Sequence, residues 1–192
     1  MTKIFVTGVD PSLSNFGMVC GWIDLDSNEF HPTALRLCET KPDSSNKTVR
    51  KNSQDLERTQ QLYKAFQEEI TSSDLIAVEI PVGSQSARSM ASYGACLGIL
   101  ASAVKWPMIQ LTPTEVKMAS VGSKTASKAD MIKWATSLYP NLNWFTNTRN
   151  GVTTYSNKNE HLADAIAAVH AAIQTNEFKQ IAMVRKSIAK TS

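Results

Sequence analysis

The sequence predicts an α/β fold in which a mixed, five-stranded sheet is flanked by helices on both faces. Short runs of apolar or alternating residues predict five strands, at 4–9, 18–23, 33–38, 75–80 and 108–111. The first three strands follow one another without a helix, which favours antiparallel pairing. The last two alternate with helical segments, and such alternation is typical of parallel strands joined by helical crossovers.

The helices are predicted from the spacing of apolar residues and from residues that begin or end a helix. Four segments have such patterns, at 53–71, 84–104, 127–138 and 159–175. The segment 84–104 is also rich in Ala, Gly and Ser, which indicates close packing. Another helix is predicted to begin at Thr112, because Pro113 and Glu115 follow it in the positions of a capped helix start.

The chain is predicted to form one domain over residues 1–192, because this length allows a substantial core. Segments 41–52 and 141–158 are polar and are predicted as mobile loops, and 176–192 is predicted as a C-terminal tail. Apolar residues make up 42% of the chain and charged residues 19%, which is ordinary for a globular protein.

Charge and cysteine usage bound the classes of function. The formal net charge of +3 permits a nucleic-acid partner without requiring one. No run reaches transmembrane length and the opening residues show no leader pattern, so we expect a cytoplasmic protein of a bacterium or a phage-infected cell, without a membrane partner. The cysteines lack metal-site spacing and are expected to be buried, reduced thiols: Cys20, Cys38 and Cys96.

Four acidic or imidazole residues stand where a metal-dependent nuclease needs them. Asp10 and Glu79 each end an apolar strand, and His161 and Asp164 lie one helical turn apart. Mg²⁺ prefers carboxylate oxygens, and two such ions can activate a water and stabilise the leaving oxygen when a phosphodiester is cleaved. We expect Asp10 to bridge two Mg²⁺ ions, with Glu79 and Asp164 on either side. His161 is expected as a ligand or as the group that orients or deprotonates water, and Mn²⁺ is expected to substitute.

Each of these residues has a plainer interpretation when it is taken alone. Asp10 precedes a proline and is typical of a turn, and His161 is typical of an exposed helix surface. Glu79 is harder to dismiss, because a carboxylate at the end of an apolar strand needs a partner. Glu160 either supports the site or favours the helix dipole, and His170 is interpreted as structural. The combination carries the metal-site prediction.

Basic and aromatic residues add two candidate contacts with nucleic acid. Four lysines lie within one segment: Lys117, Lys124, Lys128 and Lys133. They form either an ordinary solvated face or a set of phosphate contacts, and their clustering favours phosphate contacts. Within 141–158, Trp144, Phe145 and Arg149 either stack on unpaired bases or pack as part of the core or a lid.

Four short motifs, taken together, resemble the RuvC-type Holliday junction resolvases over nearly the whole chain. They cover residues 8–17, 77–79, 113–129 and 161–165. The resemblance implies the ribonuclease H-like fold and metal ligands at the four residues named above, and it places Lys117 and Lys128 against DNA. It also implies an endonuclease selective for four-way or other branched DNA junctions, which it resolves by paired nicks. Because a four-way junction has two-fold symmetry, a homodimer is expected, with 84–104 as the candidate dimer face.

Two departures from the family pattern stand out. Bacterial members often have an acid where His161 stands, and the His-x-x-Asp form is similar to the RuvC domains of CRISPR effectors and to some phage or thermophilic members. Residues 80–83 hold no aromatic, whereas some relatives stack one at the centre of the junction.

Other functions remain open from the sequence. A non-catalytic junction-binding scaffold of the same fold and a nuclease specific for RNA–DNA hybrids would both carry these motifs. Residues 10–17 also resemble the phosphate loop of actin-like ATPases, but those proteins need two such domains and this chain is too short for both.

Overall fold

The sheet is mixed and five-stranded, as the sequence predicts. The computed structural model describes residues 2–43, 45 and 50–191. Its main sheet has the order β3-β2-β1-β4-β5 and contains β1 (Lys3–Asp10), β2 (Asn15–Asp24), β3 (Phe30–Glu39), β4 (Leu75–Glu79) and β5 (Met108–Leu111). The first three strands are antiparallel, and β4 runs parallel to both β1 and β5. The register pairs Val9 with Val78, so Asp10 and Glu79 come next on adjacent strands.

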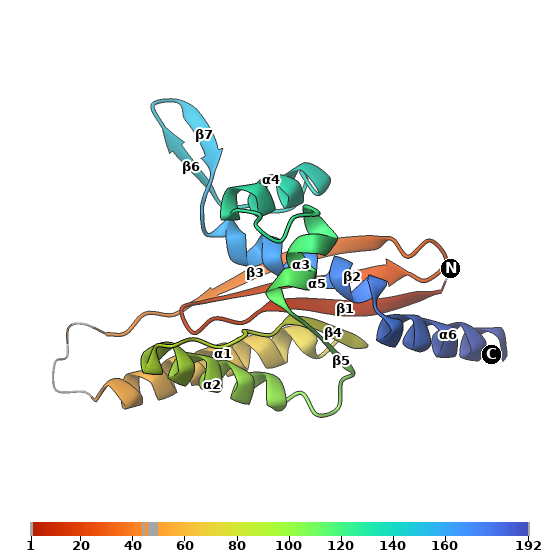
Figure 1. Ribbon diagram of the computed structural model, residues 1–192, viewed down its shortest axis with the longest axis horizontal. Coiled ribbons are helices and arrows are strands. Elements are labelled where there is room, and N and C mark those ends of the chain that lie inside the picture. The colour runs from red at the N-terminus through yellow and green to blue at the C-terminus, as the bar shows by residue number, and fades with distance from the viewer. Residues whose placement is uncertain (1, 44, 46–49, 192) are drawn as a thin grey trace.

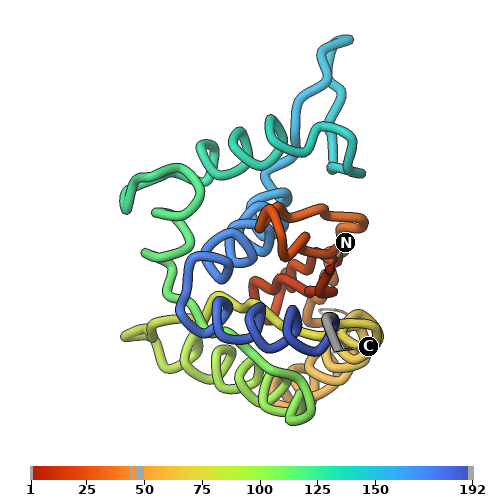
Figure 2. Tube along the Cα trace, turned by 90° about the vertical axis from the view of Figure 1, so that its right-hand side faces the viewer, coloured from red at the N-terminus to blue at the C-terminus, as the bar shows by residue number. Residues whose placement is uncertain are grey.

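Helices cover both faces of this sheet (Figure 1). One face carries α1 (Lys51–Ile70) and α2 (Ala87–Ala101), and the other carries α5 (Asn159–Gln174). Against α5 lie α3 (Pro113–Ser120) and α4 (Lys128–Leu138). Figure 2 shows the red strands between α1 and α2 on one side and α4 on the other. Each face has its own core, and Phe16 and Phe66 meet edge-to-face beneath α1. The capped helix start at Thr112 is confirmed, because Thr112 and Glu115 form a reciprocal capping box.

Two glycines allow α5 to lie directly on the strands. A Cβ atom at Gly8 would overlap the backbone oxygen of Ala165, and a Cβ at Gly17 would overlap the backbone of His161. Most of the buried residues of α5 are alanines, whose small side chains allow the helix to pack closely against the sheet. This close approach brings the first turns of α5 to the end of β1, where Asp10 stands.

The segment 141–158 was predicted as a mobile loop, but the structure shows strands in it. It contains a two-stranded hairpin of β6 (Thr146–Arg149) and β7 (Val152–Tyr155). Its turn residues, Asn150 and Gly151, both have positive φ angles, of 52° and 76°. An Asn-Gly pair between two segments rich in threonine is a strong signal for such a turn, and the sequence interpretation overlooked it.

The C-terminal segment also differs from the prediction. Residues 176–192 were expected as a tail, but Asn176–Thr191 forms helix α6. Its side chains Phe178 and Ala182 are buried in the main core, which explains why the segment is held.

The loop predicted at 41–52 ends earlier, because α1 begins at Lys51, and residues 44 and 46–49 lie outside the described part. Helix 84–104 is shorter than predicted, and α2 covers only Ala87–Ala101.

The cysteines agree in part with the prediction. All three are free thiols, but only Cys96 is fully buried, while Cys20 and Cys38 are half-buried. Burial raises the pKa of the Cys20 and Cys96 thiols to about 12, which keeps them protonated and unreactive. In the described residues, no helix is both long enough and apolar enough to cross a membrane.

Candidate active site

The four residues predicted as metal ligands gather at one end of the sheet. Asp10 and Glu79 end the neighbouring parallel strands β1 and β4. His161 and Asp164 come from the first turns of α5, which crosses this end of β1. Nδ1 of His161 and Oδ2 of Asp10 are hydrogen-bonded at 2.6 Å. A pair 151 positions apart in the sequence is therefore in direct contact.

The electrostatics show that three carboxylates share this space. Burial, together with the charges of Asp10 and Asp164, raises the pKa of Glu79 to about 8. Burial and the charge of Asp10 likewise raise the pKa of Asp164 to about 7. Close carboxylates disfavour each other's ionised forms unless a cation compensates them. The site therefore holds an excess of negative charge that a divalent cation would neutralise.

His161 joins this cluster to a further acidic residue. Burial lowers the pKa of His161, but the hydrogen bond to Asp10 and the charges of Asp10, Glu160 and Asp164 outweigh it and raise the pKa overall. Nε2 of His161 lies 3.3 Å from Oε1 of Glu160, and the same oxygen accepts a 2.8 Å bond from Nζ of Lys128. Glu160 is thus part of the cluster, and its role is not limited to the dipole of its helix.

The donor set fits Mg²⁺ or Mn²⁺ in its chemistry. Three carboxylates and one imidazole are suitable ligands for such ions, and burial together with the neighbouring carboxylates raises the pKa values of Glu79 and Asp164, so that a bound cation would favour their ionised forms. As the side chains stand, no group of three or more His, Cys, Asp and Glu residues in the described chain is arranged to hold an ion. Ligation would therefore require side chains of the cluster to turn toward the ion.

The predicted lysines divide into two groups. The charge of Lys117 on α3 lowers the pKa values of Glu79 and Asp164, so it stands near the site. Lys128, the first residue of α4, contacts Glu160. Lys124 and Lys133 are exposed, and no contact within the described residues links either of them to the four acidic and imidazole groups. The structure therefore places two of the four lysines, Lys117 and Lys128, beside the acidic cluster.

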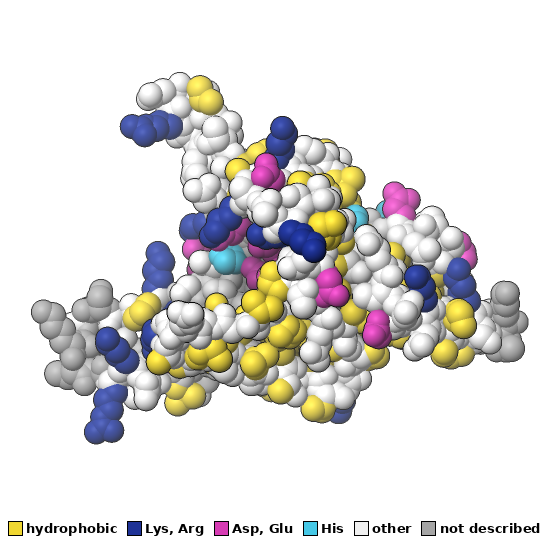
Figure 3. All heavy atoms as spheres, viewed as in Figure 1, with side chains coloured by type: hydrophobic (Ala, Val, Ile, Leu, Met, Phe, Trp, Pro, Cys, Tyr) yellow, Lys and Arg dark blue, Asp and Glu magenta, His cyan; other side chains and the backbone are white. Residues whose placement is uncertain are grey.

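A groove of about 630 Å³ opens beside His161. It is lined by side chains from the start of β2, the start of α4 and the segment that leads into α5: Asn15, Ser127, Lys128, Ala129, Asn157, Lys158, Glu160 and His161. Sequence reasoning missed Asn15, Asn157 and Lys158. The signal for Lys158 was present, because it lies three residues before His161 in a segment without acidic residues. Figure 3 shows a histidine and acidic side chains at the foot of the projecting hairpin, with basic side chains beside them.

The aromatic residues predicted as stacking candidates have different surroundings. Trp144 is buried, and its Nε1 donates to the backbone oxygen of Tyr139 at 2.8 Å, so it packs in the core. Phe145 is 41% exposed. Arg149 is exposed at the end of β6. His170 is structural as interpreted, because Nε2 is bonded to Tyr139 Oη at 2.8 Å and burial lowers its pKa to about 4.

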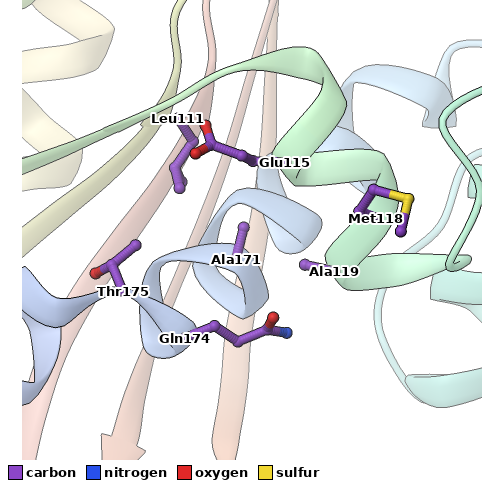
Figure 4. A pocket seen from close by; sticks show the side chains of 7 residues that line it. All are labelled: Leu111, Glu115, Met118, Ala119, Ala171, Gln174 and Thr175. Atoms are coloured by element: carbon purple, nitrogen blue, oxygen red, sulfur yellow. The ribbon is translucent and has the colours of Figure 1, made fainter.

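A second pocket, of about 400 Å³, lies between α3 and the last turn of α5 (Figure 4). Glu115 is the acidic residue in its lining, and its carboxylate accepts two bonds from Thr112 in the cap of α3. Because Ala171 and Gln174 lie about three to four helical turns beyond His161, this pocket is separate from the acidic cluster.

Comparison with known proteins supports the fold assignment. No protein-family model and no curated protein sequence matches this chain. Among solved structures, *Thermus thermophilus* RuvC in complex with a Holliday junction substrate superposes with a TM-score of 0.62 at 19% identity, covering 88% of this chain and 92% of the other. A second structure of Thermus thermophilus RuvC gives a TM-score of 0.60 at 19% identity, and the match covers 88% of this chain and 93% of the other.

A viral protein has the same arrangement of elements. Fowlpox virus resolvase, in a complex with Holliday junction DNA, superposes with a TM-score of 0.52 at 14% identity, covering 89% of this chain and 97% of the other. The matches therefore leave little of either partner uncovered. The chain therefore has the ribonuclease H-like fold in the form shared by RuvC and the poxvirus Holliday junction resolvase.

Proposed function

We propose that this protein is a metal-dependent endonuclease that resolves four-way or other branched DNA junctions by paired nicks. The observation that carries this proposal is the gathering of Asp10, Glu79, His161 and Asp164 at the ends of β1 and β4. The fold is shared with structures that are complexes of resolvases with Holliday junction DNA, which supports the same class of substrate.

The chemistry follows from the residues in the cluster. Bound Mg²⁺ or Mn²⁺ supplies Lewis acidity for phosphodiester hydrolysis. Asp10, at the centre of the cluster, is proposed to hold two such ions, with Glu79 and Asp164 as ligands on either side. His161 is proposed to ligate an ion or to orient and deprotonate the attacking water, since its imidazole is in direct contact with Asp10.

DNA is proposed to approach across α3 and the start of α4. Lys117 and Lys128 stand beside the acidic cluster and would contact phosphates next to the scissile bond. Lys124 and Lys133 are exposed and have no contact with the acidic cluster among the described residues. They are proposed to contact phosphates farther along the DNA arm.

A homodimer is the expected assembly on a two-fold symmetric junction. The proposed dimer face is α2 with the adjoining side of α1, where Gly94 and Gly98 face open space and Leu97 is 44% exposed. Sedimentation should give the mass of a dimer. Leu97→Glu is expected to shift it toward the monomer, and Val184→Glu, which adds the same charge on exposed α6, should leave it unchanged. A monomeric wild type at micromolar concentration would contradict the assembly.

The decisive experiment is cleavage of a labelled four-way DNA junction, with duplex DNA and an RNA–DNA hybrid as controls. Wild type and Asp10→Asn are compared in Mg²⁺ and in EDTA. We expect symmetric, metal-dependent nicks from the wild type and a loss of roughly 10³-fold in rate for Asp10→Asn, since the substitution removes the shared ligand. Junction binding by Asp10→Asn should persist.

Two outcomes would replace the proposal. Tight junction binding without cleavage in any metal would identify a scaffold protein of the same fold. Cleavage of the RNA–DNA hybrid alone would identify a ribonuclease H activity.

A further inference from the structure

The β6–β7 hairpin stands away from the rest of the molecule (Figures 1 and 2). Its two strands pair with each other and not with the five-stranded sheet. Every residue of both strands is exposed, including Val152 at 63% and Tyr155 at 46%. An isolated two-stranded hairpin is marginally stable and adds no core. Burial therefore does not explain why this element is present.

The base of the hairpin is held firmly on the helix that carries His161 and Asp164. Asn159, the first residue of α5, is fully buried. Its Nδ2 donates to the backbone oxygen of Phe145 at 2.8 Å, and its Oδ1 accepts from the backbone nitrogen of Phe145 at 3.0 Å. The backbone nitrogen of Ser156 donates to the same oxygen of Phe145 at 2.9 Å. These bonds fix the direction of the hairpin relative to His161, two residues along the helix.

The chemistry of the hairpin suits a polyanion. Residues 141–159 contain no Asp or Glu, and their charged members are Arg149 and Lys158. Six of the ten residues 146–155 are Asn or Thr, whose side chains donate hydrogen bonds to phosphate and sugar oxygens. Strands of four residues extend about 13 Å, so Arg149 near the turn is well beyond the edge of the acidic cluster.

The hairpin is also continuous with the groove beside His161. Asn157 and Lys158, which follow β7, form one wall of that groove, and Lys128 on α4 forms another. Nζ of Lys158 is held 2.8 Å from the carboxylate of Glu39. A DNA strand whose phosphate enters the groove would leave it along the hairpin.

We propose that the β6–β7 hairpin is a second DNA-contacting element, with Arg149 binding a phosphate of the junction arm that extends past the groove. Tyr155 and Phe145 lie against the sugars or the unpaired bases of the same strand. The inference rests on the proposed function for its substrate, and it adds a contact that the four sequence motifs do not include.

The test measures junction binding by Arg149→Gln in Ca²⁺, over a series of salt concentrations. We expect affinity to fall by about 3- to 10-fold and the slope of log affinity against log salt to decrease by about one, because one phosphate contact is lost. Arg149→Lys should restore most of both. Lys105→Gln is the matched control, since Lys105 is exposed before β5, at the opposite end of the sheet from the acidic cluster.

The outcomes separate this inference from the proposed function. If the wild type cuts junctions and Arg149→Gln matches Lys105→Gln in affinity and slope, the hairpin contact is wrong and the nuclease stands. If the wild type binds but never cuts, a weaker Arg149→Gln complex still supports the contact while the nuclease assignment fails. A wild type that binds no DNA would overturn both.

Discussion

Nδ1 of His161 lies 2.6 Å from Oδ2 of Asp10, at the point where α5 crosses the end of β1. This contact compensates one carboxylate of the cluster with an imidazole and leaves Glu79 and Asp164 without an equivalent partner. Burial, with the charge of Asp10 added to it, raises their pKa values to about 8 and about 7. The site is therefore organised around negative charge, and this charge makes its stability sensitive to pH and to divalent cations.

The first prediction concerns the stability of the protein in EDTA between pH 6.5 and 8.5. The folded-state pKa values of Glu79 and Asp164 lie above their values in an unfolded chain, so their protons stabilise the fold. That stability is complete below the unfolded values and is lost as pH rises through the folded values. His161, whose pKa is also raised, acts in the same direction. The melting temperature in EDTA should therefore fall as pH rises, by roughly 5 °C.

The chosen pH window separates this effect from His170. Burial lowers the pKa of His170 to about 4, so its contribution to stability is lost as pH falls from its unfolded value toward 4. Between pH 6.5 and about 7.5 the remaining protonation of His170 in the unfolded chain would make stability rise with pH, so a decline in this window does not come from His170. Mg²⁺ should raise the melting temperature more at pH 8.5 than at pH 6.5, and Glu79→Gln should flatten the decline. A melting temperature that is constant in EDTA would contradict the charge argument.

The second prediction concerns His161→Asp, which introduces the acid often found in related bacterial proteins. Without metal, the new carboxylate would face Asp10 and remove its hydrogen-bond partner, so the variant should melt below the wild type at pH 8. With Mg²⁺ the added ligand should recover most of this loss, and junction cleavage should stay within about tenfold of the wild type. His161→Ala, which supplies no ligand, is the comparison. Equal cleavage by both variants would show that residue 161 contributes no metal or proton chemistry.

The strand ends and α5 were predictable because each depends on local pattern. Asp10 and Glu79 end apolar runs, and the spacing of His161 and Asp164 fixes them on one helical face. The hairpin was also local and was missed because its Asn150-Gly151 signal lay within a polar stretch interpreted as a loop.

The helical spacing of Phe178, Ile181 and Ala182 in α6 was a local signal that the interpretation as a tail overlooked, whereas contacts between helices depend on tertiary placement and carry no signal in the sequence. Helix α6 is held by Phe178, whose partners come from the main core. The link from His161 through Glu160 to Lys128 joins two helices that are distant in sequence. Periodicity cannot show such contacts.

The third prediction concerns Gly17→Ala. The new methyl group would overlap the backbone of His161, so α5 would have to move away from β2. We expect the free energy of unfolding to fall by about 1–3 kcal/mol or more and cleavage to fall further than stability alone requires, because His161 and Asp164 move with the helix. Denaturant unfolding of the wild type and of Gly17→Ala measures the loss, and the cleavage rate of the folded variant is measured beside it.

The last prediction concerns Arg58, a buried arginine on α1 that holds the loop following Asp10. Its Nη2 donates to the backbone oxygen of Leu13 at 3.2 Å and to Oγ of Ser14 at 2.9 Å. Its Nη1 lies 3.1 Å from Asp55, and its side chain is 6% exposed, so few of these bonds can be replaced by water. Arg58→Met should cost about 1–3 kcal/mol of unfolding free energy, because the buried oxygens of Ser14 and Thr40 lose a hydrogen-bond donor, while Asp55 keeps Arg88 and the Leu13 oxygen keeps Thr40.

A matched control is available on the same carboxylate. Arg88 also pairs with Asp55, but its side chain is 51% exposed, so Arg88→Met should cost less than about 1 kcal/mol. If the two variants unfold at the same denaturant concentration, Arg58 is not the anchor of this loop. If Arg58→Met is selectively unstable, its junction cleavage at low temperature, where it remains folded, should also be reduced, since the loop that it releases begins next to Asp10.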